Sequence, residues 1–206
     1  MPKKEAPLSY LNNYLPEGAS EKLLEYLHRY QVHLTITRTR KSILGDYRHA
    51  TGSDNHRISV NGSLNKYAFL ITLIHELGHL ITFQQYGNRV NSHGREWKLA
   101  YRKVLEDFLH LKLFPSDIHQ TLLKSLHDLP ASSCSDVNLT RILKKYDIKN
   151  RTILVEDISE GALFKTEDGR IFKRGRQIRK RIECPELRTG KLYLFSPVFE
   201  VEPVNP

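Results

Sequence analysis

The stretch Ile-Thr-Leu-Ile-His-Glu-Leu-Gly-His-Leu-Ile, residues 71–81, decides the fold and the chemistry of this chain. It holds the pattern His-Glu-x-x-His, in which the fixed positions are His75, Glu76 and His79. Residues four apart lie on the same face of a helix, so both imidazoles can reach one metal ion. Glu76 follows the first imidazole and is placed to act as a general base on a water molecule beside that ion.

The residues around this pattern predict a buried helix, because apolar side chains continue on both sides of it. They are Leu70, Ile71, Leu73, Ile74, Leu77, Leu80, Ile81 and Phe83. Polar groups buried there without a partner would cost several kcal/mol. We expect Zn²⁺ as the partner, because zinc takes imidazole ligands and keeps one position open in catalytic sites. A pair of structural histidines is the alternative.

The third ligand decides the class of metal site. The metzincin pattern would place glycine at position 82 and histidine at position 85, but the chain has Thr82 and Gln85, which excludes that class. His93 and Glu96 are the next candidates downstream, and Glu96 is equally suited to stabilise a helix N-terminus. Spacing alone leaves this choice open.

Other histidines fit the pattern less well. Those before it lie in or beside strand patterns and are expected to face solvent, although they are ligands in principle: His33, His49 and His56. Those after it have no companion at ligand spacing: His110, His119 and His127.

Four stretches in combination resemble the SprT-like family, which includes the Spartan-type proteases that act on DNA–protein crosslinks. They are Leu44–Arg48, His56–Asn61, His75–His79 and His93–Trp97. The resemblance covers roughly residues 10–110 and implies a zincin-like metallopeptidase. It also implies that His75, His79 and His93 bind the metal and that Glu76 is the catalytic acid and base. The choice of His93 thus rests on resemblance more than on spacing.

Hydrophobic periodicity predicts an α+β fold for residues 1–114, with a small sheet packed against the helix that carries His75 and His79, which we call the metal helix. Strands are expected over 32–38, 42–50 and 56–61, and helices over 21–30, from 64 or 65 through the motif, and from 92 or 93 to about 112. The last of the three strands is a candidate for pairing with an extended peptide substrate.

The rest of the chain divides into a helical connector, 115–149, and a β-rich module, 150–206. Pro115 ends the preceding helix, and helices are expected over 117–126 and from about 136 to 146. The module carries strand patterns at 152–155, 162–166, 170–173, 177–183 and 191–195. Asp168-Gly169 and Thr189-Gly190 mark turns, so we predict a β-meander.

Cysteine usage limits what this module can be. Many SprT-like proteins carry a C-terminal zinc ribbon that needs four cysteines, whereas this chain has only Cys134 and Cys184. We therefore predict a degenerate ribbon without metal, held by apolar packing of Phe164, Phe172, Leu194 and Phe195.

Positive charge favours polyanionic partners, nucleic acid first. The chain has 32 lysines and arginines against 23 aspartates and glutamates, a net charge of +9. Seven basic residues and no acid lie between positions 170 and 181: Arg170, Lys173, Arg174, Arg176, Arg179, Lys180 and Arg181. We predict that they contact DNA phosphates, and the alternative is a solvated edge strand that uses charge against aggregation.

Composition suggests a soluble protein with no membrane partner. Apolar residues make up 39% and charged residues 27% of the chain, and no apolar run reaches the length of a membrane span. The sequence shows no secretory signal after Met1, and two cysteines make no disulfide framework, so we expect a cytoplasmic setting.

Two functions follow from these features. The first is a zinc-dependent metallopeptidase that hydrolyses peptide bonds in DNA-associated proteins. The alternative is a nucleic-acid-binding protein, associated with transcription or DNA repair, in which the metal site is structural or weakly active. Glu76 favours the first, because a purely structural site does not need a general base.

Overall fold

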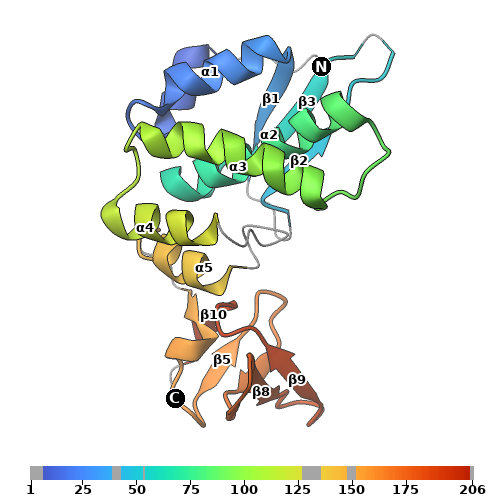
Figure 1. The fold of residues 1–206 in the computed structure, drawn as a ribbon. Coiled ribbons are helices and arrows are strands. Elements are labelled where there is room, and N and C mark those ends of the chain that lie inside the picture. The colour runs from blue at the N-terminus through green and yellow to red at the C-terminus, as the bar shows by residue number, and fades with distance from the viewer. Residues whose placement is uncertain (1–6, 39–42, 53, 127–135, 148–151, 205–206) are drawn as a thin grey trace. The chain divides into compact units, whose positions relative to one another are not determined.

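The computed structural model describes residues 7–38, 43–52, 54–126, 136–147 and 152–204. The chain forms two compact units, Met1–Tyr146 and Asp147–Pro206, each with a hydrophobic core of its own (Figure 1). Both helices and strands are present, as the sequence predicted. None of the described helices is long and apolar enough to cross a bilayer.

The sheet of the first unit has three strands in the order β1-β3-β2. β1 (Val32–Thr37) pairs in parallel with β3 (His56–Asn61), and β2 (Gly45–Arg48) pairs antiparallel with the other edge of β3. β2 is shorter than the strand expected over 42–50, whose first residue lies outside the described residues. Because β3 is central, the prediction that it pairs with a peptide substrate was wrong. β2 is an edge strand, and pairing with an added peptide requires an edge strand.

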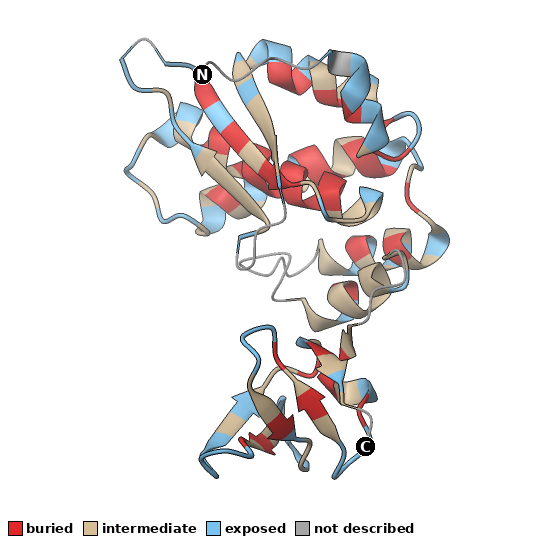
Figure 2. Ribbon diagram, turned by 180° about the vertical axis from the view of Figure 1, so that it is seen from behind, coloured by how far each residue is buried: buried red, intermediate tan, exposed pale blue. Residues whose placement is uncertain are grey.

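Helix α2 (Lys66–Tyr86) lies between this sheet and helix α3 (Arg95–His110) (Figure 1). It is buried along most of its length, and Figure 2 shows this burial in red. Asn65 caps it, because the side-chain oxygen of Asn65 accepts a hydrogen bond from the amide of Ala68 at 2.9 Å. A helix that is apolar all round belongs in the centre of a domain.

Helix α3 covers α2 with the apolar face that the sequence predicted. Its buried residues include Trp97, Ala100, Tyr101, Val104, Leu105 and Phe108. It begins at Arg95 rather than at 92 or 93, since Gly94 is its N-cap residue. It ends at His110, and Lys112 has a φ of 54°, which a right-handed helix does not allow.

The remaining helices of the first unit are α1 (Ala19–Arg29), α4 (Ser116–Ser125), α5 (Val137–Lys144) and the 3₁₀ turn η1 (Leu8–Asn13). α4 and α5, which we had expected in a connector, add Ile118, Leu122 and Leu139 to the core of the first unit. Asn65 also joins α5 to the start of α2, since its amide nitrogen donates to the carbonyl oxygen of Leu143 at 2.9 Å.

The second unit consists of two small sheets. One has the order β4-β10-β5-β6, with β4 (Ile153–Leu154), β10 (Glu200–Pro203), β5 (Leu163–Lys165) and β6 (Ile171–Lys173). The other has the order β7-β8-β9, with β7 (Gln177–Ile178), β8 (Arg181–Pro185) and β9 (Leu192–Phe195), and a short turn η3 spans Val155–Asp157. β10 was not predicted, because glutamates and a proline surround its one buried side chain, Val201.

Aromatic packing holds the second unit together. The rings of Phe164 and Phe172 are stacked with centroids 5.6 Å apart, and Phe195 meets both at their edges. The prediction that Leu194 shares this core was wrong, because Leu194 is 59% exposed. Side chains alternate along a strand, so Leu194 points outward between Tyr193 and Phe195. Cys184 is buried in this core as a free thiol, and Cys134 lies outside the described residues.

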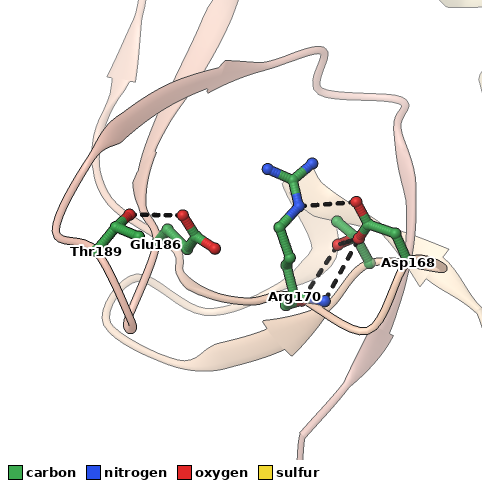
Figure 3. A network of polar contacts seen from close by, with 5 residues as sticks. Asp168, Arg170, Glu186 and Thr189 are labelled. Carbon is green, nitrogen blue, oxygen red and sulfur yellow. Dashed lines mark hydrogen bonds and ion pairs between the residues drawn. The ribbon is translucent and has the colours of Figure 1, made fainter.

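Two turns of the second unit carry a polar cluster, which Figure 3 shows. In the first turn Asp168 accepts hydrogen bonds from the Thr166 hydroxyl at 2.5 Å and from Nε of Arg170 at 2.7 Å. In the second turn the Thr189 hydroxyl donates to the buried carboxylate of Glu186 at 2.5 Å. We call these five residues the Arg170 cluster, because the Arg170 side chain lies between Asp168 and Glu186 in Figure 3.

Candidate metal centre

Three imidazoles from two segments meet at one point of the first unit. His75 and His79 come from α2, and His93 comes from the segment just before α3. Nε2 of His75 lies 3.2 Å from Nε2 of His79 and 3.3 Å from Nε2 of His93. Within the described ranges, these histidines form the one group of His, Cys, Asp or Glu side chains that could share a metal ion. Glu96, the alternative ligand from the sequence, is not in this group.

The distances from Nε2 of His75 to the other two Nε2 atoms fit a tetrahedral ion. A tetrahedron's edge is about 1.6 times its centre-to-corner distance, so zinc–nitrogen bonds of about 2.0–2.1 Å require nitrogens roughly 3.3 Å apart. The two Nε2–Nε2 distances have this value. Three ligands leave one corner of the tetrahedron for another molecule, which is the arrangement of catalytic rather than structural zinc sites.

Trp97 forms the base of the cluster. Its ring centroid lies 4.7 Å from that of His75, 5.3 Å from that of His79 and 4.7 Å from that of His93. The ring of Tyr101 stacks on the indole at 5.0 Å, and its centroid lies 5.9 Å from that of His75. Sequence reasoning placed Trp97 in the core and missed its contact with the imidazoles, because His93 lies before α3 and helical spacing does not relate the two residues.

Gly78 explains how α3 comes so close to the metal helix. A Cβ atom at this position would lie 3.1 Å from Nε1 of Trp97 and 3.1 Å from Cβ of Tyr101. Real Cβ atoms rarely have contacts this short, so a larger residue would require the Trp97 and Tyr101 side chains to shift. The glycine in His-Glu-Leu-Gly-His therefore serves the packing of the site.

Glu76 lies on the sheet side of the same helix, against β2. A Cβ atom at Gly45 would be 2.5 Å from Oε1 and 2.9 Å from Cγ of Glu76. Only glycine at position 45 allows the strand to pass this close to the carboxylate. The side chain of Glu76 is buried, and the strand beside it restricts its movement.

Burial keeps the imidazoles neutral. It lowers the pKa of His75 to about 3, with a further contribution from the charges of His79 and His93. It lowers the pKa of His79 to about 4, again with a contribution from His93, and it lowers the pKa of His93. Neutral imidazole is the form that binds metals, so the lone pairs are available at physiological pH.

A cleft of about 480 Å³ opens beside these residues. His75, Glu76 and His79 line it together with His93, β2 supplies Gly45, Asp46 and Tyr47, and the loop after α2 contributes residues 87, 88 and 90–92. This volume is in the range of ligand pockets in other proteins. A ligand in the cleft would thus contact both the imidazoles and the edge strand.

Other candidate histidines lie away from the three imidazoles. The expectation that His56 faces solvent was wrong, because His56 is buried in the central strand and its Nδ1 accepts a hydrogen bond from the amide of Ala50. His49 stacks on Phe83, and His33 is exposed on β1. His110 and His119 do not join the cluster, and His127 lies outside the described residues.

The predicted nucleic-acid-binding residues are spread from the turn before β6, through β6 and the loop after it, to the turn between β7 and β8 and the first residue of β8. Three of them make ion pairs: Arg170 with Asp168, Arg174 with Glu160 and Arg176 with Glu183. The exposed others are Lys173, Arg179, Lys180 and Arg181. They do not form one continuous strand, because residues 179 and 180 turn the chain, with Arg179 at a φ of 51°.

Comparison with known proteins agrees with this geometry. The profile of the SprT-like family matches residues 11–119, which is more than half of the chain. This chain belongs to the SprT-like family. The matched region of this SprT-like chain includes the sheet, α2, α3 and all three imidazoles.

Curated relatives match over a shorter region. A protein named Protein SprT from Pseudomonas putida strain F1 is 46% identical over 35 residues, and one of the same name from Pseudomonas fluorescens strain Pf0-1 is 49% identical over 35 residues. Each alignment covers 17% of this SprT-like chain and 21% of the relative, so the chain spans about a fifth of the relatives' length. No solved structure is a significant match.

Proposed function

We propose that this chain is a zinc-dependent metallopeptidase with a zincin-like fold, and that it hydrolyses peptide bonds in DNA-associated proteins. One observation carries the proposal. Three neutral imidazoles converge, with Nε2 of His75 at the spacing of a tetrahedral ion from each of the other two, and they line an open cleft together with a buried glutamate. A structural zinc site needs four protein ligands and no cleft.

The residues of the site have separable roles. His75, His79 and His93 would hold the ion, which when bound polarises a carbonyl and makes water acidic. Glu76 takes a proton from the attacking water as the new carbon–oxygen bond forms. Glu76 then gives this proton to the amide nitrogen as the carbon–nitrogen bond breaks, so the products are a carboxylic acid and an amine. Gly45 and β2 restrict the carboxylate's position during both transfers.

The edge strand supports a peptide as the substrate. β2 pairs with β3 on one side and borders the cleft with Gly45, Asp46 and Tyr47. An extended peptide that added to the other side of β2 would make main-chain hydrogen bonds and lie across the imidazoles. Main-chain recognition of this kind accepts many sequences, which suits an enzyme that acts on diverse proteins.

Positive charge supports DNA as the place of action. The side chains of Lys173, Arg179, Lys180 and Arg181 are exposed, and phosphate contacts of this type are independent of sequence. Replacement of Arg179, Lys180 and Arg181 by alanine should weaken DNA binding and reduce the slope of log K against log salt by about one for each phosphate that the variant no longer neutralises. Unchanged binding would reject this part of the proposal.

The peptidase is tested with Glu76→Gln. Zinc content and cleavage of a disordered protein are measured with and without DNA, and Glu17→Gln, an exposed glutamate before α1, is the matched control. We expect Glu76→Gln to keep about one zinc per chain and to lose cleavage by at least about 10²-fold. If neither the native chain nor the control cleaves, while both bind DNA in a salt-dependent way, the nucleic-acid-binding alternative replaces the peptidase.

A further inference from the structure

We propose that the cleft holds a binding subsite for an aromatic side chain of the substrate, formed by His49 and Phe83. This inference rests on the peptidase function proposed above. It gives the cleft a preference for one kind of substrate side chain, which recognition of the peptide main chain alone does not provide.

Phe83 is placed by the metal helix itself. It follows His79 by four residues, so its side chain lies on the same face of α2, about 6 Å further along the helix axis. The ring of His49, just after β2, stacks on Phe83 with centroids 4.5 Å apart and an interplanar angle of 16°. His49 is exposed and Phe83 is half-buried, so the imidazole is the layer of this stack that a ligand reaches first. Both residues line the cleft.

Neighbouring residues fix this stack in place. The ring of Tyr47 lies 6.3 Å from that of Phe83, and the Tyr47 hydroxyl is 2.9 Å from Nδ1 of His56. The amide of Ala50 donates to the same nitrogen at 3.2 Å, which ties down the backbone directly after His49. The other ring nitrogen of His56 is 2.7 Å from the side-chain amide of Gln84. The subsite is therefore ordered before a substrate arrives, which lowers the cost of binding.

A planar ring is the ligand that fits this surface best. Aromatic pairs gain free energy beyond the area that they bury, and an added ring would extend the existing stack. Cationic side chains prefer the faces of Trp, Tyr and Phe, whereas the layer that a ligand reaches here is an imidazole. An aliphatic side chain would bury area without the stacking contribution.

The position of the subsite along the substrate follows from the helix geometry. An extended peptide advances about 3.3 Å per residue, so for a peptide that runs along α2 a distance of about 6 Å corresponds to roughly two residues. We expect the aromatic residue within about two positions of the bond that is cleaved. The same reasoning predicts no selectivity at more distant positions.

The test is a series of internally quenched peptides that differ at one position, with Phe, Tyr, Leu, Arg or Ala placed in turn at each site around the cleaved bond. The ratio kcat/KM is measured for the zinc-loaded native chain, and Kd is measured with zinc-loaded Glu76→Gln, in which we expect hydrolysis to be at least about 10²-fold slower. The variants, made in both backgrounds, are His49→Ala and His49→Phe, with His33→Ala on β1 as the matched control. Both histidines are exposed, so these substitutions leave the core intact.

At one position within two residues of the bond, we expect about a tenfold preference for Phe or Tyr over Ala in both measurements, the change that one added aromatic pair gives. His49→Ala should reduce this preference below about twofold, whereas His49→Phe and His33→Ala should keep it.

Three outcomes would overturn the subsite while the peptidase stands: cleavage without aromatic preference, a preference for Arg, or a preference that survives His49→Ala. Selective binding without cleavage would support the subsite and reject the peptidase. Neither binding nor cleavage would reject both.

Discussion

Two clusters of polar side chains, one in each unit, satisfy their polar groups in different ways. In the first unit three groups of the same kind, the imidazoles of His75, His79 and His93, direct nitrogen atoms at one another. In the second unit the Arg170 cluster pairs donors with acceptors, as in the 2.7 Å contact between Arg170 and Asp168. Neutral imidazoles that converge can share a metal ion through their lone pairs, whereas the donors and acceptors of the Arg170 cluster are complete without one. The chemistry of the members, rather than their closeness, separates a binding site from a structural contact.

The largest effect that this comparison predicts is the loss of metal on His79→Ala. We expect zinc to fall from about one per chain to less than about a tenth, and cleavage to fall by at least about 10³-fold, because two imidazoles cannot complete the site. Metal analysis after dialysis measures the first quantity. Glu186→Ala in the Arg170 cluster is the control and should keep all the zinc. If Glu186→Ala also loses zinc, the two clusters are not independent.

The next effect concerns the close contact between β2 and Glu76. Gly45→Ala places a methyl carbon 2.5 Å from Oε1 and 2.9 Å from Cγ of Glu76, which is too close, so the carboxylate must move. A displacement of about 1 Å in a catalytic group can reduce the rate about 10²-fold. We expect this loss in kcat with zinc retained, and metal analysis beside the kinetics tests it. Gly52→Ala, at a turn with nothing within 4 Å of the added atom, controls for a general effect of removing a glycine.

Acid should destabilise the two units in different pH ranges. The pKa of His75 is lowered to about 3 and that of His79 to about 4, mainly by burial, while an unfolded histidine titrates near 6.5. As pH falls the unfolded chain therefore takes up protons first. The metal-free first unit should lose stability between about pH 6.5 and 4, by up to about 1.4 kcal/mol per pH unit for each imidazole.

The second unit responds at lower pH. Hydrogen bonds from Thr166 and then from Arg170 lower the pKa of Asp168 to about 2. Since the folded pKa is below the unfolded value, this contribution is present above about pH 4 and is lost as pH falls toward 2. Urea unfolding with a chelator, followed by hydrogen exchange in each unit, measures both ranges. If both units lost stability over the same pH range, the predicted difference between them would be wrong.

The smallest effect is on the stability of the second unit. Glu186→Ala removes the acceptor of the Thr189 hydroxyl and a buried carboxylate near Arg170, and we expect a loss of about 1–2 kcal/mol. Faster hydrogen exchange in β8 and β9, with α2 and α3 unchanged, would show it. Arg188→Ala, an exposed residue in the same turn, is the control and should have little effect.

The sequence predicted the central parts of this molecule well. Strand 56–61 and α3 have strong hydrophobic periodicity, and α2 is a continuous apolar run, so local pattern and tertiary burial agree. The meeting of His93 with the other two imidazoles required the family resemblance, because a loop separates it from their helix. Family membership itself is shown by the match over residues 11–119.

Other features depend on contacts that local patterns do not contain. The central place of β3 follows from sheet order, and the close approach of Gly45 to Glu76 follows from the packing of β2 on α2. β10 has few β-type residues and forms through its neighbours β4 and β5. We interpreted Arg170 only as part of a run of positive charge. Its ion pair with Asp168 depends on the turn that brings the two side chains together.

Trp97 is the single tryptophan of the chain, and its ring lies against all three imidazoles. Tryptophan fluorescence therefore comes from one place in the molecule, and the second unit contributes no tryptophan signal. A divalent cation between the histidines would place the largest local charge of the site a few ångströms from the indole. The emission of this one residue should thus record metal uptake and release in real time, without any added dye or label.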